Sequence, residues 1–340
     1  MMFKSIFNSF TMWKKILAAV LGILVGYWLI DDFDPDLLKG KRVLITGASA
    51  GIGEQMAYHY AKMGANVIVT ARREQKLQEV VARCKELGRP DGIYHYISAD
   101  MSNLTSTELV IREAHAKLGG IDYLVLNHII VIPLGMWRGT VDNLTRMDKI
   151  VDVNYKSYVK SSSHFLVFIP LQSKVAQPFS GVYSSTKFAL DGFFGSIRQE
   201  FALRNCDVSI TLCVIGLVGK VAQPFSGVYS STKFALDGFF GSIRQEFALR
   251  NCDVSITLCV IGLVGTESAI SELRNFGQHF LLKYIKAAEP PDAAYAIIRG
   301  GALRAREIYF PYMETKILTM LRDLLPRTVD YINRWVYTTS

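Results

Sequence analysis

The chain has 340 residues, half of them hydrophobic, and a formal net charge of +8 at pH 7. This length suits one large α/β domain with short additions, and the apolar fraction is enough for a sizeable core. The basic residues form no compact run, which argues against a nucleic-acid partner; scattered solvated charges or a basic surface facing a membrane are the alternatives. Two of the five cysteines repeat two others, and the spacing indicates neither a disulfide framework nor metal ligands.

Residues 1–35 are predicted to be a signal-anchor and linker. Residues 16–30 are an apolar run that two lysines precede and an acidic stretch follows. The run is shorter than the roughly 20 residues of a spanning helix, and a cleaved signal peptide is the alternative, although no clear cleavage site follows. The charge asymmetry predicts a cytosolic N-terminus and a luminal remainder. The glycosylation sequons at Asn103 and Asn143 would then face the lumen.

A dinucleotide-binding pattern follows the linker. A predicted strand at residues 42–46 leads into a glycine turn with the spacing G-x-x-x-G-x-G, and a helical pattern covers residues 54–63. Glycines let the backbone turn tightly and approach a pyrophosphate, which binds the amide groups at the helix N-terminus. The candidate cofactor-binding residues of this turn are Gly47, Ser49, Ala50, Gly51, Ile52 and Gly53.

The end of the next predicted strand, residues 66–70, indicates which dinucleotide is bound. An enzyme that selects NAD usually places a carboxylate here for the ribose 2′-hydroxyl. Ala71 occupies that place, and Arg72 and Arg73 follow it. Guanidinium groups bind a phosphate bidentately, so the pattern predicts NADP(H). The alternative is that both arginines are surface charges at the start of a helix.

The elements after it alternate between helix and strand. Because strands joined by crossover helices form parallel sheets, this alternation predicts an α/β fold, a Rossmann-type doubly wound parallel sheet. Asp100 and Met101 follow the third strand, where Asp100 is either near an adenine or a helix cap. The predicted elements are helix 74–87, strand 93–98, helix 106–118, strand 123–127 and a long helix from 141 through 163 that contains Asn154.

Four motifs together resemble the short-chain dehydrogenase/reductase family: TGASAGIG at residues 46–53, LNHI at residues 126–129, VNY around Asn154, and YSSTK. The resemblance implies a hydride transfer that interconverts a hydroxyl and a ketone with NADP(H). It also implies that Asn154 holds a water in a proton relay. The further cofactor residues that it implies are Asp100, Met101, Asn127, His128, Ile129 and Thr266.

Shorter matches, among them DDFDP, KFALDGFF and IIRGGALR, resemble the 11β-hydroxysteroid dehydrogenase subfamily. This resemblance implies a steroid or similar lipid as substrate. It also implies single-pass anchoring in the endoplasmic reticulum membrane through the N-terminal segment, with secretion as the alternative.

The catalytic motif lies in a segment that occurs twice, because residues 220–265 repeat residues 174–219 letter for letter. The first copy holds Tyr183 and Lys187, and the second holds Tyr229 and Lys233. A tyrosine can act as the general acid or base of such a reaction if its pKa is lowered. A lysine four residues later lies on the same helix face and supplies the positive charge that lowers it. Each copy therefore encodes one catalytic pair.

The segment before the repeat is too short for both the long helix and a fifth strand. In one interpretation, residues 165–169 are a stunted fifth strand. In the favoured one, residues 208–215 of the first copy are the fifth strand, residues 254–261 are the sixth, and Tyr229 and Lys233 are the working pair. The family's substrate-binding serine, expected 12 or 13 residues before the tyrosine, is absent in both copies. The enzyme is therefore expected to be impaired, or the chain to be an inactive NADP- or steroid-binding member.

The remaining chain contains a predicted helix at residues 287–301, a strand at residues 307–310 and an amphipathic helical tail. Packing in the core or in a homodimer is the default role of the tail, and a helix that dips into the membrane is the alternative. The predicted segments are residues 1–35, a Rossmann domain at residues 36–311 and the tail at residues 312–340. An exact duplicate indicates a recent duplication or an error in the assembled gene.

Overall fold

The computed structural model describes residues 33–130, 140–162, 208–215, 254–275 and 286–325, with Thr232, Leu236 and Thr328 as single residues. The chain divides into the units Met1–Pro35 and Asp36–Ser340, and the fold below belongs to the second. The predicted anchor at residues 16–30 lies outside the described residues. Among the described residues, no helix is both long and apolar enough to cross a membrane.

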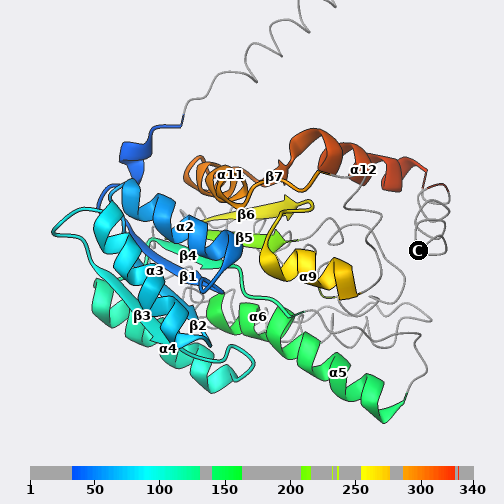
Figure 1. Cartoon of the computed structure of the whole chain (residues 1–340), viewed down its shortest axis with the longest axis horizontal. Helices are drawn as coiled ribbons and strands as arrows, with labels where there is room; N and C mark the ends of the chain where they lie inside the picture. The colour runs from blue at the N-terminus through cyan, green and yellow to red at the C-terminus, as the bar shows by residue number, and fades with distance from the viewer. Residues whose placement is uncertain are drawn as a thin grey trace, which may run out of the picture. The chain divides into compact units, whose positions relative to one another are not determined.

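A parallel sheet of seven strands in the order β3-β2-β1-β4-β5-β6-β7 forms the centre of the fold (Figure 1). The chain runs outward from β1 to β3 and then returns to the other side of β1 with β4. At such a reversal the carboxyl ends of the strands border a crevice that binds ligands. The predicted doubly wound sheet is therefore confirmed. The strands are β1 Arg42–Thr46, β2 Asn66–Ala71, β3 Tyr94–Ser98, β4 Tyr123–Leu126, β5 Val208–Ile215, β6 Val254–Ile261 and β7 Glu307–Phe310.

Helices cover both faces of the sheet (Figure 1). On one face α2 contacts α3 and α11, and on the other α4 contacts α6. A short 3₁₀ turn, η1 (Pro35–Leu38), precedes β1. The helices are α2 Gly51–Lys62, α3 Glu74–Leu87, α4 Leu104–Leu118, α5 Val141–Val151, α6 Ser157–Ser162, α9 Glu267–Asn275, α11 Pro290–Ala302 and α12 Tyr312–Leu324.

The strands β1 and β4 are buried on both faces, which explains their continuous apolar sequences. In β1, Leu44 joins the core cluster on the α4 and α6 side, together with Leu124 of β4. Its neighbours Val43 and Ile45 are fully buried as well, and they point to the opposite face because side chains alternate along a strand.

Four predicted helices differ in extent from the observed ones: α2 and α11 by one to three residues at each end, and α4 and the helix from residue 141 for the physical reasons that follow. α4 begins at Leu104, two residues earlier than expected, because the side chain of Asn103 accepts hydrogen bonds from the amides of Thr105 and Ser106 and caps the helix. The predicted continuous helix from residue 141 is interrupted by a π-helical turn, η2 (Asp152–Lys156), which separates α5 from α6. π-turns often occur at functional sites, and this one contains Asn154.

The fifth position of the sheet is taken by residues from the first copy of the repeat. β5 lies between β4 and β6, as the favoured interpretation predicts. The alternative strand at residues 165–169 lies outside the described residues. β5 and β6 have the same sequence, VSITLCVI, and pair in register from Val208 opposite Val254 to Ile215 opposite Ile261. Each residue therefore pairs with its own copy.

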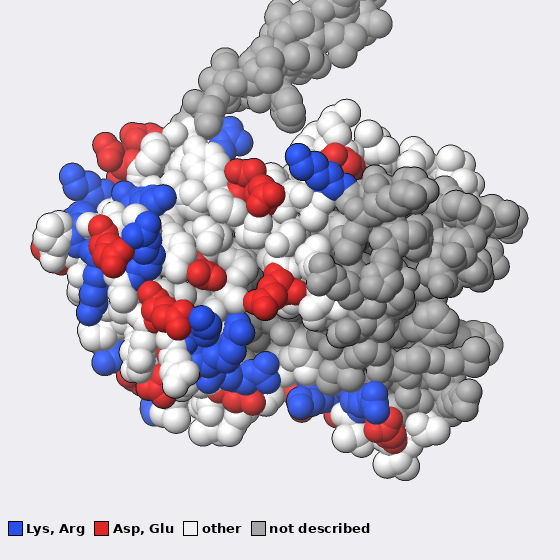
Figure 2. Space-filling model, viewed as in Figure 1, with Lys and Arg blue, Asp and Glu red and all other residues white. Residues whose placement is uncertain are grey.

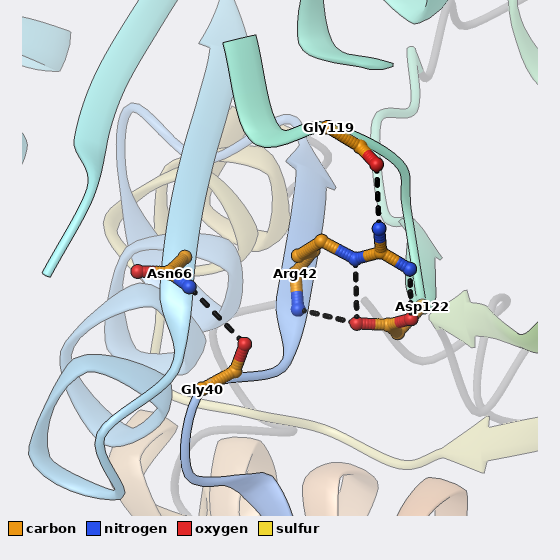
Figure 3. A network of polar contacts seen from close by, with 5 residues as sticks. All are labelled: Gly40, Arg42, Asn66, Gly119 and Asp122. Carbon is orange, nitrogen blue, oxygen red and sulfur yellow. Dashed lines mark hydrogen bonds and ion pairs between the residues drawn. The ribbon is translucent and has the colours of Figure 1, made fainter. Parts of the chain in front are cut away.

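An ion pair joins the amino-terminal ends of β1 and β4, at the opposite end of β1 from the glycine turn (Figure 3). The Arg42 guanidinium donates from Nε to Asp122 Oδ2 at 2.9 Å and from Nη2 to Oδ1 at 2.6 Å. Arg42 Nη1 also donates to the carbonyl of Gly119 at 2.6 Å. Partial burial would raise the pKa of Asp122, but the hydrogen bonds and charge of Arg42 lower it below its ordinary value. This bidentate pair holds the two strands in their order and register.

Candidate cofactor and catalytic site

The glycine turn between β1 and α2 packs directly against the end of β4. Gly47 has φ +65, and a Cβ atom there would lie 2.7 Å from the Cα atom of His128. A Cβ atom on Gly53 would lie 2.5 Å from the side-chain amide of Asn127. Any larger residue would force these backbones apart. The N-cap residue of α2 is Ala50, whose side chain makes no capping bond, so the first amides of the helix are open to an anion.

Arg73 connects the end of β2 to the same turn. Its guanidinium donates from Nε and Nη2 to the hydroxyl of Ser49, at 3.2 and 3.1 Å. The predicted NADP-selecting arginine and a predicted turn residue are therefore neighbours. A small cavity beside them, of about 150 Å³, is lined by Ser49, Ala50, Glu54, Arg73, Lys76, Glu79, Val80 and Glu267.

Asp100 and Met101 follow β3, beside the turn that contains Arg72. Asp100 Oδ1 accepts a hydrogen bond from the amide of Ser102 at 2.9 Å. Partial burial would raise the pKa of Asp100, but the bonds from Ser102 and the charges of Arg72 and Lys149 lower it. The Met101 side chain is buried in the core cluster, so only its backbone is available to a ligand. The helix cap at α4 is Asn103, not Asp100.

Asn127 lies directly under the glycine turn and is buried. Its side-chain amide donates to the carbonyls of Thr46 and Gly47, at 3.2 and 3.0 Å. Its Oδ1 atom has no hydrogen-bond partner among the described residues, although a buried polar atom without a partner is costly. An acceptor in this position fits a ligand that carries a hydroxyl or amide donor. The turn and Asn127 therefore suit a dinucleotide.

Asn154 is fully buried, and its side chain binds the backbone just beyond β4. Oδ1 accepts from the amide of Ile130 and Nδ2 donates to its carbonyl, both at 2.8 Å. This pair of bonds joins η2 to the 128–130 segment, which includes His128 and Ile129. Because the side chain is engaged there, any water that Asn154 holds would have to share those atoms or use the backbone carbonyl.

Thr266 follows β6 and reaches the glycine turn from the other side. Its methyl carbon lies 3.0 Å from the position that a Cβ atom on Gly51 would occupy. Its hydroxyl accepts from the amide of Ala269 at 3.3 Å, so Thr266 also caps α9. Thr266 thus adjoins the helix N-terminus that is expected to bind the pyrophosphate.

The two predicted catalytic pairs, Tyr183 with Lys187 and Tyr229 with Lys233, lie outside the described residues. Two residues of the second copy are described, however. Thr232 and Leu236 are helical and buried, 3% and 0% exposed. Leu236 belongs to the same core cluster as Tyr158 of α6. The second copy therefore contributes to the core on the face of the sheet that carries η2.

Sequence reasoning missed three residues around His128. Thr46, Ser157 and Tyr158 are fully buried, and each makes a hydrogen bond to His128. Ser157 and Tyr158 lie in what the sequence presents as an ordinary stretch of helix. Only their hydrogen bonds to His128, just beyond the end of β4, distinguish them from other helical residues.

Charged side chains of both signs are interspersed over the described part of one face of the molecule (Figure 2). Near the glycine turn the basic Arg73 and Lys76 alternate with Glu54 and Glu79. Arg73, at the end of β2, thus lies among charges of both signs.

A sequence model of the short chain dehydrogenases matches residues 41–219. The "Hydroxysteroid 11-beta-dehydrogenase 1-like protein" of Gallus gallus is 43% identical over 311 residues, covering 88% of each chain. The protein of the same name from Xenopus tropicalis is 39% identical and covers 95% of this chain and 97% of its own.

Solved structures resemble the fold. A short chain dehydrogenase/reductase from Burkholderia phymatum in complex with NAD superposes with a TM-score of 0.62 at 16% identity, covering 84% of this chain and 94% of its own. A short-chain alcohol dehydrogenase from Sinorhizobium meliloti gives a TM-score of 0.59 at 22% identity, covering 80% and 94%.

Proposed function

The chain belongs to the short-chain dehydrogenase family, and on that premise we propose that it is an NADP(H)-dependent oxidoreductase. It interconverts a hydroxyl and a ketone on a steroid or a similar lipid. The substrate class is supported by relatives named as hydroxysteroid 11-beta-dehydrogenase 1-like proteins, which are 36–43% identical over most of the chain.

The observation that carries the proposal is the glycine turn with Arg73 bound to it. Gly47 and Gly53 leave no room for a side chain, and the amides of α2 are uncapped, as a pyrophosphate site requires. Arg73 and Ser49 lie together at the end of β2, where the ribose of a bound dinucleotide is expected. A guanidinium and a hydroxyl favour a 2′-phosphate, and Ala71 ends β2 at the place where a carboxylate would bind a 2′-hydroxyl.

When bound, the nicotinamide cofactor supplies or accepts the hydride. The chain's own residues then manage the proton. Tyr229 donates it to the oxygen of the new alcohol, and Lys233, four residues later, stabilises the tyrosinate by its positive charge. Asn154 holds the strand end beside this centre through its two bonds to Ile130.

Two observations favour the second copy as the one that forms the site. The first copy already supplies β5, so the segment that follows this central strand is the second copy. Thr232, next to Lys233, and Leu236 are buried in the core. The family match, which ends at Gly219 and includes Tyr183, is the argument for the first copy.

The test is NADPH oxidation by the purified chain with a panel of ketosteroids. We expect Tyr229→Phe to lower kcat by about 10²–10⁴-fold, the usual contribution of a general acid. Tyr183→Phe, the same change in the same local sequence, is the matched control and should retain activity. Loss of activity in Tyr183→Phe alone would assign the site to the first copy.

The cofactor preference is tested separately. We expect Arg73→Ala to raise the KM for NADPH by about 10-fold or more and to leave the KM for NADH nearly unchanged, because only the former carries the 2′-phosphate. Lys76→Ala, a basic residue of the same cavity, is the control for a general loss of positive charge. Equal effects on both nucleotides would contradict the NADP assignment.

A second candidate function is a non-catalytic NADP- or steroid-binding protein. It is favoured by the residue after β5, where the family pattern expects a substrate-binding serine and this chain has Gly216. Nucleotide binding without turnover of any ketosteroid in the same panel would favour this function over the enzyme.

A membrane-associated, luminal location accompanies the proposed function, with secretion as the alternative. Apolar side chains at helical spacing on α12 support membrane contact: Met313, Ile317, Met320 and Leu324 are 60%, 46%, 51% and 71% exposed. The same exposed face would equally suit the homodimer that we propose. Sedimentation with and without detergent tests both the membrane contact and the homodimer.

The luminal orientation can be tested at Asn103. This sequon asparagine caps α4 through its Oδ1 atom and is exposed, so a glycan on Nδ2 would leave the cap intact. In cells we expect a glycosidase-sensitive mass shift that becomes smaller by one glycan in Asn103→Asp, which keeps the capping oxygen and leaves the second sequon at Asn143 unchanged. Thr105→Ser keeps the sequon and is the control. No shift in the wild-type chain would contradict luminal exposure.

A further inference from the structure

His128 lies at the point where three parts of the site meet. It follows the end of β4, is 7% exposed, and has backbone atoms against Gly47 of the glycine turn. Its ring reaches β1 on one side, with Nδ1 2.8 Å from the hydroxyl of Thr46. On the other side Nε2 lies 2.6 Å from the hydroxyl of Ser157 at the start of α6.

The hydrogen-bond partners determine which ring nitrogen carries the proton. Ser157 Oγ lies 2.5 Å from the carbonyl oxygen of Val153, which can only accept, so Ser157 must donate there. Its single hydrogen is then used, and Ser157 has to accept from His128. Nε2 therefore carries a proton.

The other side of the ring follows from Thr46. Its hydroxyl oxygen accepts from the backbone amides of Asn127 and His128, at 3.0 and 3.4 Å, and these occupy its two lone pairs. It cannot accept a third proton from Nδ1, so it donates its own hydrogen to Nδ1. The carbonyl of Val125, 3.1 Å from Thr46 Oγ1, is the longer competing acceptor. A neutral ring, protonated on Nε2, satisfies both sides.

These hydrogen bonds form a continuous series from the glycine turn to the π-helical turn η2, which contains Asn154. Thr46 immediately precedes Gly47, and Val153 immediately precedes Asn154. The backbone of His128 is fixed too, because Tyr158 donates from its hydroxyl to the His128 carbonyl at 2.6 Å. The ring centroids of His128 and Tyr158 lie 4.6 Å apart. Displacing the ring would therefore move the glycine turn and η2 relative to each other.

We propose that His128 is a positioning residue for hydride transfer, a neutral imidazole that fixes the glycine turn and the Asn154 turn in one geometry through Thr46 and Ser157. This rests on the proposed function, because positioning matters only if these two turns act on one substrate. Misplacement of reacting groups by about 1 Å can cost on the order of 10²-fold in rate, so rigidity between the two turns has a large effect on kcat.

The activity test uses two serines of the same helix. Ser157→Ala removes the acceptor of the Nε2 proton. Ser161→Ala is the matched control, since Ser161 is also fully buried but its hydroxyl has no hydrogen-bond partner among the described residues. We expect Ser157→Ala to lower kcat about 10-fold or more with little change in the KM for NADPH, and Ser161→Ala to behave as wild type.

Two substitutions of the histidine sharpen the test. The amide of glutamine overlaps the Nε2 position, and that of asparagine overlaps Nδ1. His128→Gln should therefore retain more of kcat than His128→Asn, because it can still donate to Ser157. Equal kcat in Ser157→Ala and Ser161→Ala, or a better result with asparagine than with glutamine, would overturn the proposal.

Two measurements on the full chain need no turnover and separate this inference from the proposed function. Nitrogen-15 NMR of the ring should show the Nε2-protonated neutral tautomer, and an Nδ1-protonated or cationic ring would overturn the proposal. Hydrogen exchange at the Ile130 amide, which donates to Asn154, should accelerate at least several-fold in Ser157→Ala and not in Ser161→Ala. If both hold and no ketosteroid is turned over, the proposed function fails while the coupling of the two turns stands.

Discussion

The strands β1 to β4 and the pair β5 and β6 are built from the same kinds of residues, yet their pairing is fixed in different ways. Each of the first four strands has its own sequence, and specific polar contacts join the ends of β1 and its neighbour β4: Arg42 with Asp122 at one end, and Thr46 with Asn127 at the other. β5 and β6 are identical and pair residue by residue with themselves. In this half, side-chain identity cannot tell one strand from its neighbour.

This difference shows what decides a strand's place when its sequence does not. Exchanging the two octapeptides would leave the sequence of the chain unchanged, because all eight positions are equal. Their places in the sheet depend instead on the segments that follow them in the chain. β5 is followed by the second copy of the repeat, and β6 is followed by Thr266, which contacts Gly51 and caps α9.

The largest effect is expected when the same leucine is replaced separately in each copy of the repeat. Leu236 is fully buried in the core cluster, and Leu190 is its counterpart in the first copy. Leu236→Ala should lower the free energy of unfolding by about 2–5 kcal/mol, as a new core cavity does, and Leu190→Ala by less than half as much. Urea denaturation measures both. Equal losses would mean that both copies fill comparable core positions.

The next effect concerns the residue that follows β5. If the absence of a serine impairs the enzyme, Gly216→Ser or Leu217→Ser should raise ketosteroid turnover by about 10²–10³-fold, the usual contribution of one such donor. The steady-state rate with NADPH measures it. The same change at Gly262, which directly follows β6, is the control and should give no gain. A gain at Gly262 alone would place the substrate beside the other strand.

A smaller effect is expected at the ion pair of β1 and β4. Asp122→Asn should cost about 1–2 kcal/mol at neutral pH, since the side chains of Arg42 and Asp122 are 35% and 20% exposed and solvent weakens the pair. The pKa of Asp122 is lowered on folding, so its contribution is present above the unfolded pKa of about 3.9 and is lost as pH falls through the folded pKa.

The stability difference between wild type and Asp122→Asn should therefore be constant near pH 7 and disappear in acid. A difference that persists at pH 2 would show that packing and not ionisation carries it. Glu79→Gln, at the exposed ion pair with Lys76, is the control and should cost much less than Asp122→Asn at any pH.

The smallest effect is expected at Thr266, after β6. Thr266→Ala removes the capping bond to Ala269 and should cost about 0.5–1 kcal/mol, and Thr266→Ser should be nearly neutral. Thermal unfolding measures both. If Thr266→Ala also weakens NADPH binding while the serine variant does not, the hydroxyl contacts the cofactor as well as the helix.

Much of the fold follows from local pattern. The bounds of β1, α3, β6 and β7 were predicted to the residue, because glycine turns and apolar runs mark them clearly. The Asn103 cap and the π-turn at Asn154 were not predicted. The first depends on a choice between two nearby capping residues, and the second on bonds to Ile130, 24 residues away in the chain.

By itself the sequence determined the sheet class, the glycine turn and the candidate residues for contact with a dinucleotide, because these depend on spacing within one short segment. It also specified two equal candidate catalytic pairs and two equal strands. Only the tertiary structure decided that β5 and β6 lie side by side, that Leu236 enters the core, and that His128 joins Thr46 to Ser157. The physical reason is that identical segments have identical local preferences, so only contacts with distant parts of the chain can distinguish them.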